Sequence, residues 1–419
     1  MVAIEFKKLF GRFDYKVKLN NDGLTILTGP NGYGKSTILR SIEAIGNGIT
    51  GIVYFFSLDF KKITFWFERR KKVVIEKRTD ELIINNYSIK KEVFRDAVDS
   101  IFERRPYMVR IDEDTWRDRR NGARLSTEQY VMNYIKDRKR DYSLVFPDEI
   151  IQIINDMRGL IGDIYFIEEQ RLIRTNKNKA YDQETVNIID ELPNKFKVLI
   201  SSVQQNYSAI SSELDSTYPN RLFENEEGIT KDEYQTKMLE MKSKFDKMIK
   251  YDLSALQTTA NFVFKEEHAK ALKIYFDDFD EKYSVYEELI NKMELYTDII
   301  NARLSFKEIK ISPKNGIYIL DENNKQLELR QLSSGEKQEI VLFYELIFGS
   351  HDNELLMIDE PEISLHIAWQ KRFMNDLIKI IEYKHINAIV ATHSPQIINH
   401  HWDKQIDLGE LYGKQLNKR

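Results

Sequence analysis

Apolar and polar residues alternate with a period of two over most of residues 2–84, as in strands that bury one face. The runs with this pattern are VAIEF, DYKVKL, LTILTG, IVYFF, ITFWFE, KVVIEK and ELIINN. A helical pattern interrupts them after Lys35, so residues 1–95 predict a strand-rich lobe with one helix. The basic tetrad Arg69–Lys72 stands between two strands, where a solvated hairpin turn is a simpler interpretation than a DNA contact.

Residues 96–160 predict helices with interleaved arginines and acidic residues, a pattern typical of solvated surfaces. A contact with nucleic acid or with a partner protein stays open for this segment. The run DIYFIEEQRL, within residues 161–175, then predicts a short strand that ends in acidic residues and Gln170.

Residues 176–304 predict long helices that form a coiled coil or bundle, because apolar residues recur there at spacings of three and four. Three stripes have this spacing: Ile189, Leu192, Phe196, Leu199, Val203, Tyr207, Ile210 and Leu214; Tyr234, Met238, Met241, Phe245 and Met248; Phe279, Tyr283, Tyr286, Ile290, Met293, Tyr296 and Ile300. We expect the turns near residues 218–233 and 254–261, and we interpret the aromatic side chains as core.

Strand patterns return in residues 305–419 as EIKIS, GIYIL and QLEL, and helix and strand patterns then alternate. The chain therefore predicts one α/β domain, with a mixed sheet and an antiparallel β lobe, that is split by a long helical insertion.

The composition fits a globular protein, with 42% hydrophobic and 31% charged residues and a net charge of −4. This charge gives no general attraction to nucleic acid or to anionic membranes. The absence of cysteine excludes disulfides and thiolate metal sites and suits a reducing cytosol. No apolar run approaches the roughly 18 residues that suggest a membrane helix. We expect a soluble cytoplasmic protein with no membrane partner.

The stretch GPNGYGKS, residues 29–36, matches the G-x-x-x-x-G-K-[ST] phosphate-binding loop and has a strand before it and a helix after it. Backbone amides at the helix N-terminus would face the phosphates of ATP. Lys35 would reach the β- and γ-phosphates, and the Ser36 hydroxyl would bind Mg²⁺. The expected phosphate-binding positions are Asn31, Gly32, Tyr33, Gly34, Lys35, Ser36 and Thr37.

The stretch ELLMIDEPE places Asp359 and Glu360 at the end of an apolar strand. Asp359 would hold Mg²⁺, and Glu360 would orient and deprotonate the attacking water. An apolar strand ending in acidic residues is unremarkable alone, but a phosphate-binding loop in the same chain makes the catalytic interpretation the better one.

Two further stretches complete the set. In QLSSGEKQE, Ser333 and Glu336 form a capping box at the head of a predicted helix, whose N-terminus is also an anion site. In INAIVATHSPQ, a buried strand delivers His393 to its end, where a lone histidine would usually be structural.

These four stretches, in this order, resemble the ABC-type ATPases of the SMC, RecF and OLD kind over residues 1–95, 160–172 and 305–419. The resemblance implies that Ser333 and Gly335, in LSSGE, belong to the signature loop that binds the γ-phosphate of the opposite subunit. It implies that Gln170 meets Mg²⁺ and water, and that His393 senses the γ-phosphate.

The resemblance also sets expectations at less determined positions. PEISLH matches the D-loop, but the aspartate common in transporters is His366 here, which leaves its role open. Arg12 and Phe13 lie where adenine contacts are expected. Because the family closes its sites across a dimer, we expect a homodimer or higher homo-oligomer that forms around ATP.

The biological role has two main alternatives. The short helical insertion of residues 176–304, the strand end YFIEEQRL and the stretches DEPEISLH and ATHSPQII resemble ATPase subunits of anti-phage defence systems such as PARIS and Septu. A DNA-repair or DNA-maintenance ATPase of the RecF or SMC type is the alternative, and nucleic acid stays open as a partner. A transporter subunit fits less well, because its P-loop and signature lie closer together.

A nuclease or toxin activity is expected from a separate effector protein rather than from this chain. Only 26 residues follow His393, too few for a nuclease domain. The cluster His400, His401 and Asp403 suggests a metal site, but a polar helix end is the simpler interpretation.

Overall fold

The computed structural model of the chain describes residues 1–93, 107–112, 115–120, 122, 124–126, 148–168, 173–176, 184–254, 263–351 and 354–416. The chain divides into two compact units. Unit 1 comprises Met1–Gln170 and Gly349–Arg419, and unit 2 comprises Arg171–Phe348.

An antiparallel sheet of order β2-β1-β4-β5-β6-β7 forms one part of unit 1. Its strands are β1 (Ala3–Leu9), β2 (Phe13–Lys18), β4 (Lys62–Trp66), β5 (Lys72–Lys77), β6 (Glu81–Ile84) and β7 (Tyr87–Lys90). The period-two pattern is confirmed for these runs, because alternate residues such as Ile4, Phe6 and Ile63 are fully buried. The basic tetrad lies at the hairpin between β4 and β5, with a 3₁₀ turn at Glu68–Arg70.

The run IVYFF is not a strand, and the prediction was wrong there. It lies in helix α2 (Ile49–Ser57), which packs on α1 (Lys35–Gly46). The two helices approach so closely at Gly51 that a Cβ there would lie 1.7 Å from the carbonyl oxygen of Ala44. A short unbroken apolar run has no period, so the sequence could not separate strand from helix.

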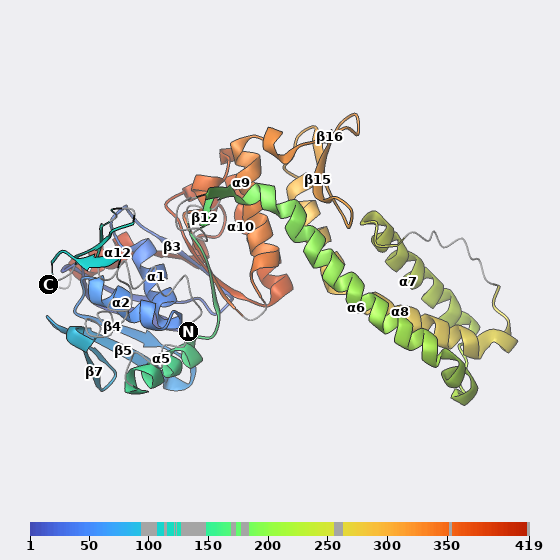
Figure 1. Ribbon diagram of the computed structural model, residues 1–419, viewed down its shortest axis with the longest axis horizontal. Coiled ribbons are helices and arrows are strands. Elements are labelled where there is room, and N and C mark those ends of the chain that lie inside the picture. Colours follow the sequence, from blue (N-terminus) through green and yellow to red (C-terminus); the bar gives the residue numbers. More distant parts are fainter. Residues whose placement is uncertain are drawn as a thin grey trace. The chain divides into compact units, whose positions relative to one another are not determined.

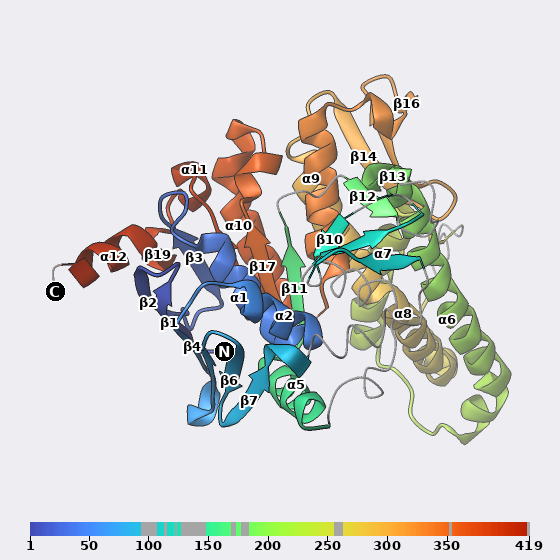
Figure 2. The ribbon, with the colours of Figure 1, turned by 60° about the vertical axis from the view of Figure 1, so that its left-hand side comes forward.

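A parallel sheet of order β11-β17-β18-β3-β19 forms the other part of unit 1. Its strands are β11 (Ile164–Ile167), β17 (Leu355–Asp359), β18 (Asn387–Ala391), β3 (Leu24–Thr28) and β19 (Gln405–Asp407). Helix α1 contacts β11, β17 and β18, and α5 (Asp148–Ile161) packs beside it, as Figure 2 shows. Three more helices, α10 (Ile367–Lys384), α11 (Pro395–Ile398) and α12 (Leu408–Leu416), complete the unit, with a 3₁₀ turn at Trp402–Lys404.

Within residues 96–160 the helical prediction is wrong for part of the segment. Strands β8 (Met108–Arg110), β9 (Thr115–Asp118) and β10 (Arg124–Ser126) form a small antiparallel sheet. These strands are too short for a period to appear, and cross-strand contacts decide their structure. The helix α5 at the end of the segment agrees with the prediction.

Unit 2 contains three long helices, α6 (Ile188–Glu224), α7 (Lys231–Lys250) and α8 (Ala269–Asn301), with a 3₁₀ turn at Glu266–His268. Helices α6 and α8 run side by side, and α7 packs on α8 (Figure 1). The apolar stripes face inward, as predicted: residues such as Phe196, Met241 and Ile290 are buried. The first expected turn is shorter than predicted, because α6 continues through Pro219 to Glu224.

The rest of unit 2 packs on the ends of α6 and α8. It comprises the hairpin β12 (Ile173–Asn176) and β13 (Glu184–Asn187), the sheet β14 (Lys307–Ser312), β15 (Gly316–Asp321) and β16 (Gln326–Leu327), a 3₁₀ turn at Leu329–Gln331, and α9 (Ser334–Tyr344), which continues as a π-turn at Glu345–Gly349. The strands predicted from EIKIS and GIYIL are therefore present, whereas only Gln326–Leu327 of QLEL is a strand and Leu329 begins the 3₁₀ turn. Among the described residues, no helix has the length and apolarity needed to cross a bilayer.

Candidate nucleotide site

The loop between β3 and α1 has the backbone of an anion-binding turn. Gly29, Gly32 and Gly34 have φ values of 142°, 81° and 90°, which favour glycine. A Cβ on Gly34 would lie 3.1 Å from the side chain of Leu9, so the site is also sterically restricted. Gly34 is the N-cap of α1 and offers no side-chain cap, which leaves the first amides of the helix for a ligand.

Lys35 is the cation of this loop, and its side chain is only 5% exposed. Its ammonium donates to the carbonyl oxygen of Gly29 at 3.0 Å and lies 3.5 Å from Oε1 of Glu360. A buried ammonium with so few partners suits a strongly anionic ligand.

Hydrogen bonds from two side chains, one in α1 and one in α2, stabilise the first turn of α1. The carbonyl oxygen of Thr37 accepts from Ser41 Oγ at 2.7 Å and from the Tyr54 hydroxyl at 3.2 Å. Ser36 and Thr37 are half-buried, whereas Asn31 and Gly32 at the tip of the loop are exposed.

The aromatic residues beside the loop differ in what they can contact. Phe13 is 3% exposed, and its ring packs on Tyr33 at 5.2 Å and on Tyr412 of α12 at 4.9 Å between centroids. Arg12 is exposed and lies over the Phe13 ring. Phe13 is thus part of the core beneath the loop, and Tyr33 packs on it rather than standing free.

Phe10 was not identified from the sequence, although it is 39% exposed. A Cβ on Gly34 would lie 3.5 Å from its ring, which places Phe10 at the rim of the loop. The sequence contained one sign of this position, an aromatic residue in the turn between the first two strands. The left-handed φ of 51° at Phe10 is visible only in the structure.

Asp359 and Glu360 lie at the carboxyl end of β17, the neighbour of β18. Asp359 is 5% exposed. The backbone amide of Glu360 donates to the carbonyl oxygen of Ala391 on β18 at 2.9 Å, so the two strand ends are fixed to one another. Since β18 also pairs with β3, one sheet edge carries the loop, both acids and the turn with His393.

Glu360 and His393 make direct contact at this edge. Nδ1 of His393 lies 2.6 Å from Oε2 of Glu360 and 3.1 Å from Oε1 of Glu362. Burial raises the pKa of the Glu360 carboxyl, and the neighbouring Glu362 carboxyl raises it further, while His393 and Lys35 act in the opposite direction. This carboxyl is therefore more basic than an ordinary glutamate.

Glu360, Glu362 and His393 are also the grouping of acidic and histidine side chains that could hold a cation within the described residues. The 2.6 Å contact between Nδ1 of His393 and Oε2 of Glu360 is a hydrogen-bond distance. His400, His401 and Asp403 form no such group in the described part of the chain, and His401 Nε2 lies 2.9 Å from Asn375 Oδ1.

The predicted signature residues belong to unit 2. Ser333 is the N-cap of α9, and its side chain and that of Glu336 form the expected capping box. Nζ of Lys307 donates to Oε1 of Glu336 at 2.9 Å. Gly335 lies in the first turn of the helix. Gln170 lies outside the described residues.

His366 has a structural contact in unit 1. It is the N-cap of α10, where its Nδ1 accepts from the amide of Ala368 at 3.3 Å, and its ring packs edge-on against Trp369.

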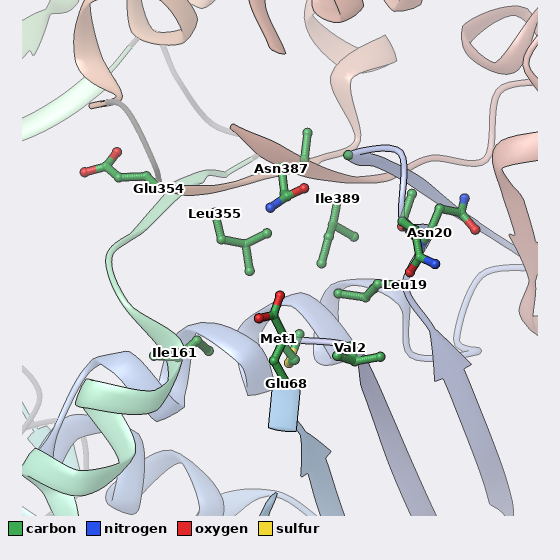
Figure 3. A pocket seen from close by; sticks show the side chains of 14 residues that line it. Met1, Val2, Leu19, Asn20, Glu68, Ile161, Glu354, Leu355, Asn387 and Ile389 are labelled. Carbon is green, nitrogen blue, oxygen red and sulfur yellow. Dashed lines mark hydrogen bonds between the residues drawn. The ribbon is translucent and has the colours of Figure 1, made fainter. Parts of the chain in front are cut away.

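A cavity of about 340 Å³ lies elsewhere in unit 1 (Figure 3). Its lining includes Gly23, Leu355 and Asn387, at the amino ends of β3, β17 and β18, and the acids Glu68 and Glu354. It is therefore at the opposite end of these strands from the P-loop and contributes no residue to the site.

Three comparisons relate the chain to known proteins. A family model described as "AAA domain, putative AbiEii toxin, Type IV TA system" matches residues 24–399. The comparison with curated proteins gives no match.

Solved structures of SMC heads are similar to the chain at low identity. An SMC head with an extended coiled coil bound to the C-terminal domain of ScpA, from Pyrococcus furiosus, is 13% identical over 97% of this chain and 92% of that chain, with a TM-score of 0.38. An SMC head bound to the C-winged helix domain of ScpA is 13% identical over 97% and 93%, with a TM-score of 0.40. The SMC head domain from Thermotoga maritima is 12% identical over 95% and 91%, with a TM-score of 0.33.

Proposed function

The chain belongs to the family described as "AAA domain, putative AbiEii toxin, Type IV TA system", and on this premise we propose that it is a Mg²⁺-dependent ATPase. The observation that carries the proposal is the meeting of Lys35, Glu360 and His393 at the carboxyl ends of three adjacent parallel strands. A phosphate site, an acid and a histidine at one sheet edge are the parts that nucleotide hydrolysis needs.

The residues present fit ATP and Mg²⁺. The uncapped N-terminus of α1 and the buried ammonium of Lys35 supply amide dipoles and a positive charge for phosphates. The hydroxyl of Ser36 and the carboxylate of Asp359 are oxygen ligands of the kind that Mg²⁺ prefers, and we assign them with Gln170 to the metal. When bound, Mg²⁺ would neutralise charge that develops on the phosphates.

In the proposed reaction, Glu360 orients the attacking water and accepts its proton. Its partial burial and its hydrogen bond to His393 hold the carboxyl in one orientation. The raised pKa makes the carboxylate a stronger base than an exposed glutamate once it is ionised. The exposed ring of His393 beside it would contact the terminal phosphate.

We assign Ser333 and Gly335 to the γ-phosphate of a second copy of the chain, so that ATP would join two chains. The position of Ser333 at the N-terminus of α9 supports this, because helix N-termini favour anions, although here Ser333 and Glu336 form a capping box. ATP binding would then close a homodimer, and ATP hydrolysis would open it.

We further propose that this cycle controls a separate effector, a nuclease or toxin, in bacterial anti-phage defence. The family description names a putative toxin of a Type IV TA system, which supports a role in such a system, and the assignment of the effector to a separate protein is our own. The long α6–α8 pair offers a surface to hold a partner. We expect the purified chain to hydrolyse ATP slowly and to cleave neither DNA nor RNA.

The test is to purify the chain alone and with the products of its neighbouring genes, and to measure ATP hydrolysis, nuclease activity and growth inhibition for each. ATP hydrolysis by the chain alone, with toxicity only in the presence of a co-purifying partner, supports the proposal. Toxicity of the chain alone, kept in Glu360→Gln, would contradict the assignment of the effector to another protein.

A further inference from the structure

Glu362 is a buried carboxylate that the sequence did not single out. It lies in the 3₁₀ turn Pro361–Ser364 directly after Glu360 and is 7% exposed. Its Oε1 accepts from Thr392 Oγ1 at 2.6 Å, from the amide of His393 at 2.9 Å and from the amide of Ser394 at 3.1 Å. All three donors belong to the turn after β18 that carries His393.

The same turn is fastened on its other side by Gln370 of α10. The hydroxyl of Ser394 donates to Oε1 of Gln370 at 2.8 Å. Nε2 of Gln370 in turn donates to the carbonyl oxygens of Glu362 and Leu365 at 3.3 and 3.2 Å. The 3₁₀ turn, the turn after β18 and the start of α10 therefore form one closed hydrogen-bonded ring with Glu362 at its centre.

The ring of His393 has little else to hold it. Its side chain is 51% exposed, and its contacts at Nδ1 are Glu360 at 2.6 Å and Glu362 at 3.1 Å. An exposed imidazole would otherwise sample several rotamers. The buried carboxylate of Glu362 accepts charge-assisted hydrogen bonds from the backbone amides of His393 and Ser394, which fixes the backbone that carries the imidazole. The contacts at Nδ1 then fix the orientation of the ring.

We propose that Glu362 is the positioning residue that holds His393 against Glu360. Its hydrogen bonds hold the turn that carries His393, so it acts on hydrolysis through His393, in addition to the direct effect of its carboxyl on the pKa of Glu360. This inference rests on the proposed ATPase function and adds a residue that neither the sequence motifs nor the family match assigns. The carboxylate is needed as a hydrogen-bond acceptor, so an uncharged acceptor of the same shape should serve in part.

The experiment compares Glu362→Ala with Glu362→Gln in steady-state ATP hydrolysis and in binding of a fluorescent ATP analogue. Glu362→Ala leaves the Thr392 hydroxyl and the His393 amide without this acceptor, while the Ser394 amide keeps Thr392 Oγ1 at 3.0 Å. The substitution should lower kcat by about 10- to 100-fold, with the nucleotide Kd within about threefold of wild type. Glu362→Gln keeps an oxygen for these donors and should retain kcat within about fivefold of wild type.

Thr392→Val removes one of the three donors and keeps the shape, so it should lower kcat by less than Glu362→Ala. The matched control is Thr25→Val. Thr25 is also buried but lies in β3, at the end of the same sheet away from the site, where its hydroxyl accepts from the amide of Asn20 at 2.9 Å. This control should leave kcat unchanged. These two conservative variants keep the test valid if Glu362→Ala does not fold.

The decisive measurement repeats Glu362→Ala in a His393→Ala background. If Glu362 acts through His393, its removal there should lower kcat by at least about fivefold less than in the wild-type background, because coupled residues are not additive. The loss that remains reflects the direct effect of Glu362 on the Glu360 carboxyl. A full loss in that background, or no rescue by glutamine, would overturn the inference. A wild-type chain without ATPase activity would instead refute the proposed function, whereas wild-type kcat in Glu362→Ala would refute only the role of Glu362.

Discussion

Glu360 adopts a left-handed backbone conformation, with φ of 46° and ψ of 60°, which is uncommon for a residue with a side chain. Such conformations cost about 1–3 kcal/mol and persist where the surroundings impose them. Here the hydrogen bond from the Glu360 amide to the carbonyl oxygen of Ala391, and the contacts of the Glu360 side chain with His393 and Lys35, impose this conformation. The strain aims the carboxyl along the sheet edge, which suits the base of a hydrolytic site.

Glu360→Gln should lower kcat by at least about 100-fold, because glutamine cannot accept the proton of the attacking water. ATP binding should stay within about threefold of wild type, since glutamine has nearly the same shape. The measurement is steady-state phosphate release together with equilibrium nucleotide binding. Glu382→Gln, an exposed acid on α10, is the control. Wild-type turnover in Glu360→Gln would remove Glu360 from its role.

Lys35→Ala should act on binding itself. A hydrogen bond to a charged group contributes about 1.5–3 kcal/mol, so loss of the ammonium should weaken ATP binding by about 10- to 100-fold. Titration calorimetry with a non-hydrolysable ATP analogue measures this change. Lys18→Ala, an exposed lysine at the end of β2, should bind normally. An unchanged Kd in Lys35→Ala would show that the loop does not hold phosphates.

At the scale of elements, α9 is packed directly on the ends of the two long helices of unit 2. The ring of Phe196 in α6 lies 5.6 Å from Tyr296 in α8 and 5.3 Å from Tyr344 in α9. The hydroxyl of Tyr296 donates to the carbonyl oxygen of Ile340 at 3.0 Å. A displacement of the long helices would therefore be passed to α9, whose N-cap is Ser333.

A buried ion pair strengthens this junction. Nε of Arg303, which follows α8, lies 2.5 Å from Oε1 of Glu339 in α9, and both side chains are at most 3% exposed. Arg303→Met would leave the Glu339 carboxylate buried without its cation, which should destabilise unit 2 by about 3–5 kcal/mol. Thermal and urea unfolding monitored by circular dichroism measure the loss.

The matched control for this pair is Arg330→Met, since Arg330 forms an exposed pair with Asp190 and such pairs contribute about 0–1 kcal/mol. A further Glu339→Leu substitution in the Arg303→Met variant should recover part of the lost stability, because it removes the buried charge. Equal unfolding curves for Arg303→Met and Arg330→Met would contradict the structural importance of the buried pair.

Ser333→Arg should abolish hydrolysis and leave nucleotide binding intact, because a large cation would block the γ-phosphate of the facing chain. Ser333 also caps α9, and loss of such a cap costs about 1 kcal/mol. Ser333→Thr keeps the capping hydroxyl and should retain activity, which separates the two effects. Normal hydrolysis by Ser333→Arg as an isolated monomer would rule out a composite site.

At the scale of the whole molecule, the phosphate-binding loop belongs to unit 1 and the signature residues belong to unit 2. If two chains form the site together, each contributes one half and receives the other. A twofold-symmetric dimer then has two equivalent composite sites. ATP would act as the ligand that joins the chains, and its hydrolysis would release them.

Mixing Glu360→Gln with Ser333→Arg tests this arrangement. Each variant alone should be inactive, but a mixed dimer combines an intact Glu360 from one chain with an intact Ser333 from the other. With random pairing in a symmetric dimer, about a quarter of wild-type activity should return. The readout is phosphate release across a series of mixing ratios. Inactivity at every ratio would contradict site sharing.

The sequence by itself determined the parts whose chemistry is local. The P-loop, the acids after an apolar strand and the histidine after another are defined by neighbours in the chain, so their placement at strand ends could be predicted. The apolar stripes of α6, α7 and α8 were equally readable, because a helix buries residues three and four apart.

Tertiary structure decided what depends on contacts between distant residues. The run IVYFF lies in a helix that packs on α1, and strands β8, β9 and β10 exist only through cross-strand pairing. The pairing of β17 with β18 brought Glu362 to Thr392 and His393. No spacing encodes these contacts, because hydrogen bonds between two turns depend on which strands are neighbours, and that order is set by packing of the whole sheet.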